Sequence, residues 1–256
     1  MMFSFAFLTG TVLPKLIEAV PTTLSLTFIS GAASLVIGVP LALAAGARGF
    51  AWRWPARGWI TLIRGTPLLV QIYLLYYGFG QILPREWMRD SWASPFLRDA
   101  YWYAIVALAI NESAYVATIL RGAIAGVPAG EVEAGYAFGM SRWRVLRSIV
   151  GPRALRLALP ALIGETILLM KSTVLASTIT VFDVLGTANT LRFETFRVYE
   201  PLAGAAIVYV ALVVAFTWPA ALLEKRLNRY LVRETPHSKG NAARSGARVE
   251  TIGALR

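Results

Sequence analysis

Five polar side chains interrupt two otherwise apolar stretches, and they are the residues of this sequence best suited to binding chemistry. Asn111 and Glu112 are adjacent in one stretch, whereas Glu165, Lys171 and Ser172 lie in another. Ionisable groups inside a membrane are costly to bury and usually face a bundle interior or a water-filled cavity. The two carboxylates suit the cationic part of a ligand, Lys171 suits a carboxylate, and the amide and hydroxyl suit either.

The spacing of these groups leaves their partners open. Glu165 and Lys171 are six residues apart, which is about 9 Å along a helix, so they are not expected to pair with each other. Glu112 could instead neutralise Lys171 between two helices, or Lys171 could extend to the membrane boundary. A proton relay of Glu112, Glu165 and Lys171 in a secondary transporter is the alternative function, but the sequence shows no internal repeat of the kind such carriers contain.

The composition excludes several other classes of protein. Of the 256 residues 57% are hydrophobic, and the mean hydropathy is +0.58, both far above the balance of a globular domain. The sequence has no cysteine and a single histidine, His237, in a polar tail, so we expect no catalytic residue and no metal site. The net charge of +11 is spread between apolar stretches, which argues against nucleic-acid binding.

The apolar stretches are long enough to place the polar groups inside a membrane. About 20 apolar residues cross the roughly 30 Å of bilayer hydrocarbon as a helix. We therefore predict an all-α integral membrane protein, with an interfacial helix at residues 1–20, a transmembrane domain at 21–232 and a disordered tail at 233–256. No basic residue precedes the first apolar run, so a cleaved signal peptide is not expected. The five predicted transmembrane helices cover residues 22–46, 60–82, 100–122, 157–181 and 202–223.

The first two predicted spans carry local signals of packing and of depth in the membrane. Arg64 lies near one end of the second span, where its long side chain can reach the membrane boundary as an anchor. Small side chains in the first span indicate the close approach of a neighbouring helix. They are Gly31, Ala32, Ala33, Ser34 and Gly38.

The basic residues orient the predicted spans. Lys and Arg outnumber Asp and Glu by four to none in 48–64, by six to two in 121–156 and by eight to three from residue 224 onward. The connections 84–100 and 183–200 have three against three and two against three. Since cytoplasmic loops are enriched in Lys and Arg, we predict an N-terminus outside and a C-terminus inside.

The connection 129–156, between spans three and four, is the polar segment with the strongest helix signals. Pro128 suits a helix start, and Gly139 suits the left-handed conformation that ends many helices. Ser141 is placed to cap a following helix, which Pro152 is expected to break or kink. The pattern predicts two short cytoplasmic helices joined by a tight turn.

Three motifs, which follow one another at residues 64–71, 121–124 and 133–139, together resemble permease subunits of ATP-binding-cassette importers. Glu133-Ala134-Gly135 followed by Gly139 is similar to the cytoplasmic EAA loop of these subunits. The stretches 64–71 (RGTPLLVQ) and 121–124 (RGAI) resemble the branch of the family that handles polar amino acids, and 165–183 resembles the group for basic amino acids and opines. The resemblance extends over about residues 20–230.

The resemblance implies an importer of a polar, basic amino acid or opine in the bacterial inner membrane. The chain has no G-x-x-x-x-G-K-[ST] loop, so ATP and Mg would be used by a partner ATPase, and this chain would be neither an enzyme nor a cofactor-binding subunit. The implied partners are two copies of the ATP-binding subunit, a second permease, homologous or identical, and an extracytoplasmic solute-binding protein. The ATPase would dock on 131–150, with a coupling helix that contains Glu131, Glu133, Ala134, Gly135, Phe138 and Gly139. The alternative to a docking role is that this amphipathic segment lies on the membrane surface.

Three positions depart from the family pattern. Gly135 replaces the usual second alanine of the loop, and Gly151-Pro152 replaces a Leu-Pro pair. Thr118 stands where this branch often has a glutamate, so no acidic ligand contact is carried over to position 118.

Overall fold

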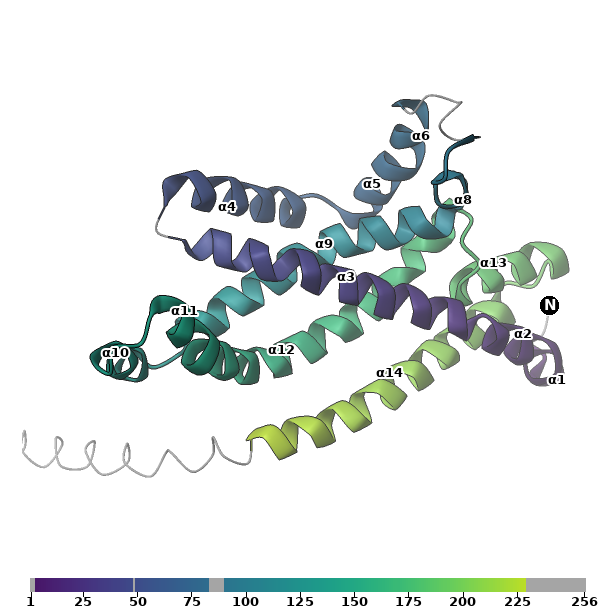
Figure 1. Cartoon of the computed structure of the whole chain (residues 1–256). Coiled ribbons are helices and arrows are strands. Elements are labelled where there is room, and N and C mark those ends of the chain that lie inside the picture. The colour runs from purple at the N-terminus through teal and green to yellow at the C-terminus, as the bar shows by residue number, and fades with distance from the viewer. Residues whose placement is uncertain (1–2, 48, 83–89, 229–256) are drawn as a thin grey trace, which may run out of the picture. The chain divides into compact units, whose positions relative to one another are not determined.

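A computed structural model gives the arrangement of residues 3–47, 49–82 and 90–228, and every regular element in these ranges is helical (Figure 1). The predicted all-α architecture is therefore confirmed for the described part of the chain. By contacts the chain divides into two units, 1–217 and 218–256. The predicted tail 233–256 and His237 lie outside the described residues.

The principal helices, with their bounds, are α3 (Val20–Gly46), α4 (Phe50–Gly65), α5 (Leu68–Tyr73), α9 (Ala100–Ala125), α10 (Ala129–Ala137), α12 (Gly151–Ser172), α13 (Val184–Thr195) and α14 (Tyr199–Asn228). Shorter elements are α1 (Phe5–Phe7), α2 (Leu13–Glu18), α6 (Phe79–Ile82), α8 (Ser94–Leu97) and α11 (Arg142–Val145), the π-helices η1 (Leu8–Val12), η2 (Leu74–Gly78) and η3 (Leu146–Val150), and the 3₁₀-helix η4 (Thr173–Ile179).

Four helical stretches of the described chain are long and apolar enough to cross a membrane, and a bent helix pair makes a fifth if it counts as one span. The four are Phe5–Gly46, Ala100–Ala125, Arg142–Ile179 and Tyr199–Leu222. The N-terminal residues, predicted as a separate interfacial helix, thus run almost straight into α3.

Helix α9 is the central helix of the first unit, because α3, α4, α5 and α12 all pack against it. In the most apolar 18-residue stretch of each candidate span, the buried share is 61% for α9, against 28, 22 and 11% for the other three. Small residues allow the approach. A Cβ atom on Gly38 of α3 would lie 2.8 Å from Val116 Cγ1 and 3.0 Å from the Ser113 carbonyl oxygen of α9.

The stretch 60–82, predicted as one continuous span, contains a sharp break. Helices Phe50–Gly65 and Leu68–Gly78 meet at an angle of 102°. Pro67 lacks an N–H group, and its ring disfavours the helical conformation for the preceding residue. Thr66 is accordingly extended, with φ −113° and ψ 141°. One proline therefore divides the predicted span.

The second helix of the polar segment 129–156, expected to break or kink at Pro152, does not break there, since the helical stretch continues from Arg142 to Ile179. The π-helix η3 precedes the proline, and the Gly151 N–H bonds the Leu146 carbonyl five residues back. A Cβ atom on Gly151 would lie 2.9 Å from that carbonyl oxygen. We attribute the continuity to this wider turn, in which glycine leaves room that leucine would fill.

The connection 183–200, expected as a polar loop, forms helix α13. Asp183 caps the helix, since its Oδ1 accepts a hydrogen bond from Gly186 N at 2.8 Å. Its Oδ2 accepts another from the Tyr209 hydroxyl of α14 at 2.9 Å. Burial raises the pKa of the Asp183 carboxyl to about 6. The connection is therefore a folded element tied to α14.

The N-terminal helical segment packs against α13 and α14 through an apolar stripe formed by Leu8, Val12 and Leu16. Gly204 of α14 accommodates the stripe, because a Cβ atom there would lie 2.7 Å from Val12 Cγ1. The stripe therefore makes this segment part of the core of the first unit.

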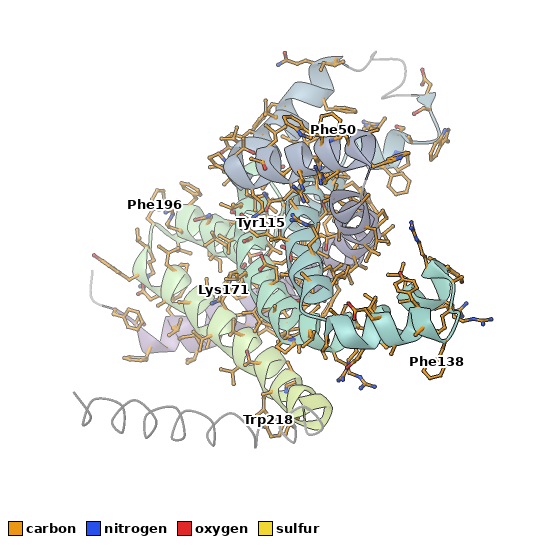
Figure 2. All side chains as sticks on the ribbon, turned by 90° about the vertical axis from the view of Figure 1, so that its left-hand side faces the viewer. Phe50, Tyr115, Phe138, Lys171, Phe196 and Trp218 are labelled. Carbon is orange, nitrogen blue, oxygen red and sulfur yellow. The ribbon has the colours of Figure 1, made fainter. Side chains whose placement is uncertain are left out.

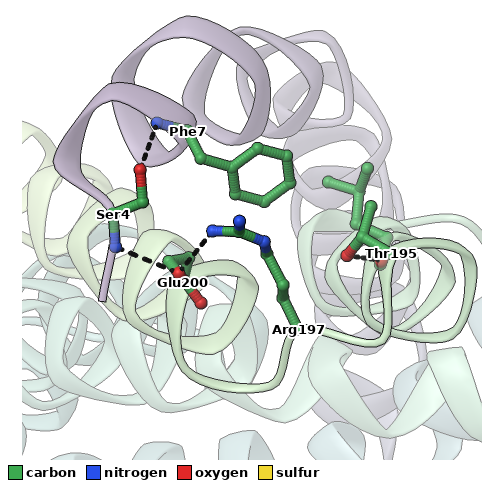
Figure 3. Close-up of polar contacts among 6 residues, drawn as sticks. Ser4, Phe7, Thr195, Arg197 and Glu200 are labelled. Carbon is green, nitrogen blue, oxygen red and sulfur yellow. Dashed lines mark hydrogen bonds and ion pairs between the residues drawn. The ribbon is translucent and has the colours of Figure 1, made fainter. Parts of the chain in front are cut away.

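Polar contacts hold the start of the same segment (Figure 3). Ser4 N donates to Glu200 Oε1 at 3.1 Å, and Arg197 Nη1 lies 3.0 Å from the same oxygen. The Arg197 guanidinium carbon also lies 4.7 Å from the centre of the Phe7 ring. Glu200 is only 4% exposed, so this contact is a buried junction between the two ends of the first unit's sequence.

Candidate functional site

A cavity of about 500 Å³ lies where the break between α4 and α5 faces α9 and α12. The break supplies backbone and short side chains at one wall, and the two long helices supply polar side chains at the others. Its polar lining residues are Arg64, Thr66, Asn111, Glu112, Tyr115, Glu165 and Ser172. Polar groups from helices far apart in sequence thus meet in one hollow.

Four of the five residues predicted to bind a ligand line this cavity: Asn111, Glu112, Glu165 and Ser172. Lys171 does not line it and is exposed. Within the described ranges no ion pair shorter than 4.0 Å joins Glu112 to Lys171, so the predicted neutralising pair is not observed there. The proton-relay alternative requires all three charges, and Lys171 lies apart from the other two.

Glu112 is the most enclosed of the cavity's charged groups. Its side chain belongs to a residue that is 7% exposed, on the face of α9 that meets α12. It also borders a second cavity of about 460 Å³, whose other walls are mostly apolar side chains of α3 and α12. Neither Glu112 nor Glu165 forms an ion pair with any described residue. Arg64 of the same cavity acts on Glu165 electrostatically but forms no ion pair with it. Carboxylates without an ion pair in such a place suit a cationic ligand.

Arg64 is the cavity residue that the sequence arguments placed elsewhere, as an anchor at the membrane boundary. Its guanidinium carbon lies 5.0 Å from the centre of the Tyr115 ring. Its Nη1 donates to the Thr118 hydroxyl at 3.3 Å, and that hydroxyl donates in turn to the Ala114 carbonyl at 2.8 Å. Position 118 therefore offers Arg64 a neutral hydroxyl oxygen.

Because no described acid pairs with Arg64, its positive charge is available to a ligand carboxylate. The signal that could have found it was the RGTP motif, in which the proline bends the chain and turns the end of α4 toward the cavity.

The second candidate site is the segment that begins with α10, which lies at the opposite end of the long helices from α13 (Figure 1). The predicted turn is present: Gly139 has φ +75°, and Met140 N donates to the Gly135 carbonyl at 3.1 Å. Ser141 Oγ caps the next helix by accepting from Arg144 N at 3.4 Å. These contacts fix the angle between α10 and α11.

Residues of this segment fall into an exposed set and a packed set. Glu133, Ala134, Phe138 and Gly139 are exposed, and Phe138, at 88%, points away from the neighbouring helices (Figure 2). Gly135 is buried against η3. A surface with an exposed aromatic ring and an exposed carboxylate is suited to contact with another protein.

Glu131 does not belong to the exposed set, because its carboxylate forms a bidentate ion pair with Arg153 of α12. Arg153 Nε lies 3.1 Å from Glu131 Oε2 and 3.2 Å from Oε1, and its Nη2 also bonds Oε1. The hydrogen bond to Arg153 holds the pKa of the Glu131 carboxyl below its usual range. Glu131 therefore fastens α10 to the membrane helices.

The fold and the two sites define a transport subunit that spans the membrane, and comparison with known proteins identifies its family. Residues 38–229 match the family described as binding-protein-dependent transport system inner membrane component. The chain belongs to this family, whose members are multi-pass proteins of the inner membrane.

Named relatives align with this chain over most of its length. The chain is 43% identical over 247 residues to the octopine transport system permease protein OccM of Rhizobium radiobacter, an alignment that covers 94% of this chain and 98% of the relative. It is 29% identical over 215 residues to the arginine transport system permease protein ArtQ of Bacillus subtilis, covering 84% and 93%.

Solved structures show the same fold. An amino acid ABC transporter crystallised with histidines superposes with a TM-score of 0.77 at 31% identity, and the match covers 88% of this chain and all of that chain. The MetNI methionine transporter superposes with a TM-score of 0.70 at 17% identity, covering 88% and 99%. At that lower identity the likeness concerns the fold alone.

Proposed function

We propose that this chain is the transmembrane subunit of an ATP-driven importer that moves a basic amino acid or opine across the inner membrane. The observation that carries the proposal is the charge distribution of the cavity, in which two unpaired carboxylates, Glu112 and Glu165, share one hollow with Arg64. The names of the relatives, which include octopine, nopaline and arginine permeases, agree with this distribution.

The ligand would meet the cavity through complementary charges. Arg64 would receive the carboxylate of an amino acid, while Glu112 and Glu165 would receive its cationic side chain. Asn111 and Ser172 would add hydrogen bonds. Rocking of the helices would separate the cavity walls and release the bound ligand. Alternating access would follow from this movement.

ATP hydrolysis would take place in a separate subunit that docks on residues 131–150, because this sequence has no phosphate-binding loop. ATP and Mg would thus be bound by the partner. The exposed Glu133, Ala134, Phe138 and Gly139 would form the contact, and Glu131 with Gly135 would hold α10 on the membrane helices. The working complex would contain two ATP-binding subunits, a second permease, homologous or identical, and an extracytoplasmic solute-binding protein.

Uptake of labelled arginine into proteoliposomes that contain the complete complex tests the substrate site. Glu165→Gln is expected to reduce uptake of arginine at least tenfold, with assembly of the complex unchanged, because the carboxylate that faces the cation is lost. Glu194→Gln, at an exposed position of α13, is the matched control and should transport normally. Lys171→Gln tests the residue that the structure leaves outside the cavity. Normal arginine uptake by Glu165→Gln would contradict the proposed site.

Coupling to the ATPase has its own test. Gly139→Pro cannot adopt φ +75°, since proline holds φ near −65°. Glu133→Lys reverses an exposed charge, and Glu194→Lys does so far from α10. Both α10 variants should insert and assemble but hydrolyse ATP without uptake, whereas Glu194→Lys should remain coupled. Normal uptake by both α10 variants would refute the docking role.

A further inference from the structure

Gln71, on α5, occupies the break in the bent helix pair and makes more side-chain hydrogen bonds than any predicted cavity residue. Its Nε2 donates to the Ile63 carbonyl at 2.9 Å, to the Thr66 carbonyl at 3.3 Å and to the Thr66 hydroxyl at 2.7 Å. The residue is buried, with 9% exposed. Buried amides that join two helices in this way set the geometry around them.

The proline at the break explains why an amide is needed there. In a continuous helix the Ile63 carbonyl would accept from the N–H of residue 67, four positions on. Pro67 has no N–H, so this acceptor loses its partner. The Gln71 amide nitrogen supplies a donor at 2.9 Å, and the Thr66 hydroxyl donates to the same carbonyl at 3.3 Å. The side chain therefore replaces a backbone group that the sequence removed.

This contact also fixes which end of the Gln71 amide faces α9. Backbone carbonyls only accept hydrogen bonds, so the nitrogen of Gln71 has to face Ile63 and Thr66. Its Oε1 then faces α9, where it accepts from Asn111 Nδ2 at 3.1 Å. Since Asn111 must present its nitrogen to Gln71, its carbonyl oxygen, Oδ1, turns the other way. Within the described residues this oxygen accepts no hydrogen bond, and Asn111 lines the cavity.

We propose that Gln71 is a positioning residue that holds Asn111 with its amide oxygen toward the cavity. This inference rests on the proposed function. The oxygen joins the carboxylates of Glu112 and Glu165, so the wall formed by α9 and α12 presents acceptors to the ligand. Such a wall favours a guanidinium, which only donates hydrogen bonds, over a neutral ureido group, whose carbonyl oxygen would oppose Asn111 Oδ1. Gln71 thereby sets selectivity without touching the ligand.

Arginine and citrulline are the probes for this selectivity, because citrulline is nearly the same shape and replaces the guanidinium by a ureido group. In proteoliposomes with the complete complex, Gln71→Leu should lower the ratio of the citrulline KM to the arginine KM by about tenfold, the effect of one hydrogen bond to a charged group. The leucine frees Asn111 to turn its nitrogen toward the ureido oxygen. Gln81→Leu, an exposed glutamine on α6, is the control and should keep the wild-type ratio.

Rescue distinguishes positioning from general structural support. The exchanged pair Gln71→Asn with Asn111→Gln keeps the order of donors and acceptors and the summed length of the two side chains. It should recover most of the KM ratio that either single exchange loses. The proposal is overturned if Gln71→Leu reduces uptake of both probes equally, or if the exchanged pair is no better than the product of the single variants.

Failure of the proposed function would leave a separate result. If the wild-type complex does not transport arginine, the substrate class is wrong, and the link between the two amides is then tested by thermal unfolding of the purified complex. Non-additive shifts in Tm for Gln71→Leu, Asn111→Leu and the double variant support the link. Additive shifts overturn it.

Discussion

Gly135 of α10 lies directly against Ile149 of η3. A Cβ atom on Gly135 would come within 2.6 Å of Ile149 Cδ1 and within 3.2 Å of Val145 Cγ2. The glycine that departs from the usual EAA pattern is therefore matched to the side chains beneath it. An alanine at this position requires the end of the Ile149 side chain to turn aside and Val145 to give way slightly.

Gly135→Ala is expected to lower the free energy of unfolding, because overpacking costs about 1–3 kcal/mol. That cost exceeds the about 1 kcal/mol that alanine gains in helix propensity. Ile149→Val removes the atom in closest contact, so Gly135→Ala should be better tolerated in that background. Thermal unfolding of the four purified complexes measures the difference. Equal effects of Gly135→Ala in both backgrounds would show that the contact is unimportant.

Gly38→Ala probes the closest approach of α3 and α9. Here the obstacle includes the Ser113 carbonyl oxygen, 3.0 Å from the added carbon, and backbone cannot turn aside as a side-chain end can. We expect a loss of about 1–3 kcal/mol in unfolding free energy. Gly58→Ala is the control, since position 58 is also inside a helix but has nothing within 4 Å of the added carbon. The prediction fails if both variants are equally stable.

Asp183 predicts a pH dependence of stability. Its pKa is about 6 in the folded protein and 3.8 in its usual environment, so the folded state holds the proton more tightly than the unfolded state. The stabilisation of the folded state by the proton on Asp183 is complete below pH 3.8 and is lost as the pH rises through about 6. Asp183→Asn keeps one oxygen that caps α13 and places an amide nitrogen that can donate to the Tyr209 hydroxyl oxygen, but it does not titrate.

The Tm of the wild-type complex relative to Asp183→Asn should therefore fall between pH 4 and pH 7, a window set by the raised pKa of Asp183. Asp183→Ala should be the least stable at every pH, because it removes the oxygens that accept from the Tyr209 hydroxyl and from the first turn of α13. The two losses amount to about 2–4 kcal/mol. A constant Tm difference between wild type and Asp183→Asn would contradict the shifted pKa.

The Glu131–Arg153 pair predicts the opposite dependence. The lowered pKa of Glu131 means that its contribution is present above the usual glutamate pKa and is lost as the pH falls through the folded value. Glu131→Gln should therefore loosen α10 at neutral pH, seen as faster amide exchange over 129–137, and should match the wild type in acid. Glu133→Gln is the control. Equal exchange rates in wild type and Glu131→Gln at pH 7 would exclude a fastening role.

The sequence arguments were most successful where one residue type has few alternatives. Polar groups inside apolar stretches usually face a cavity, and Asn111, Glu112, Glu165 and Ser172 do so, whereas Lys171 does not. A glycine between two helical patterns most often ends the first helix, as Gly139 does. Both inferences depend on local chemistry that surrounding packing cannot easily reverse.

Sequence was a poor guide where contacts with residues distant in the chain determine the local structure. Pro67 divides a span and Pro152 does not, and the difference lies in the π turn before Pro152 and the amide of Gln71 after Pro67. Hydropathy does not distinguish the surroundings of the two prolines. Arg64 was placed at the membrane boundary for the same reason, since only the bend brings it beside Tyr115 of α9.

The junction between Ser4 and Glu200 has a consequence for the order in which the protein folds. The two residues are 196 positions apart, so the helical segment that carries Leu8, Val12 and Leu16 is made before the parts of α13 and α14 on which it packs. Until then Leu8, Val12 and Leu16 have no protein surface to pack against and must be covered by lipid or by the insertion machinery. This segment thus completes its native contacts only after a long stretch of later sequence has been made.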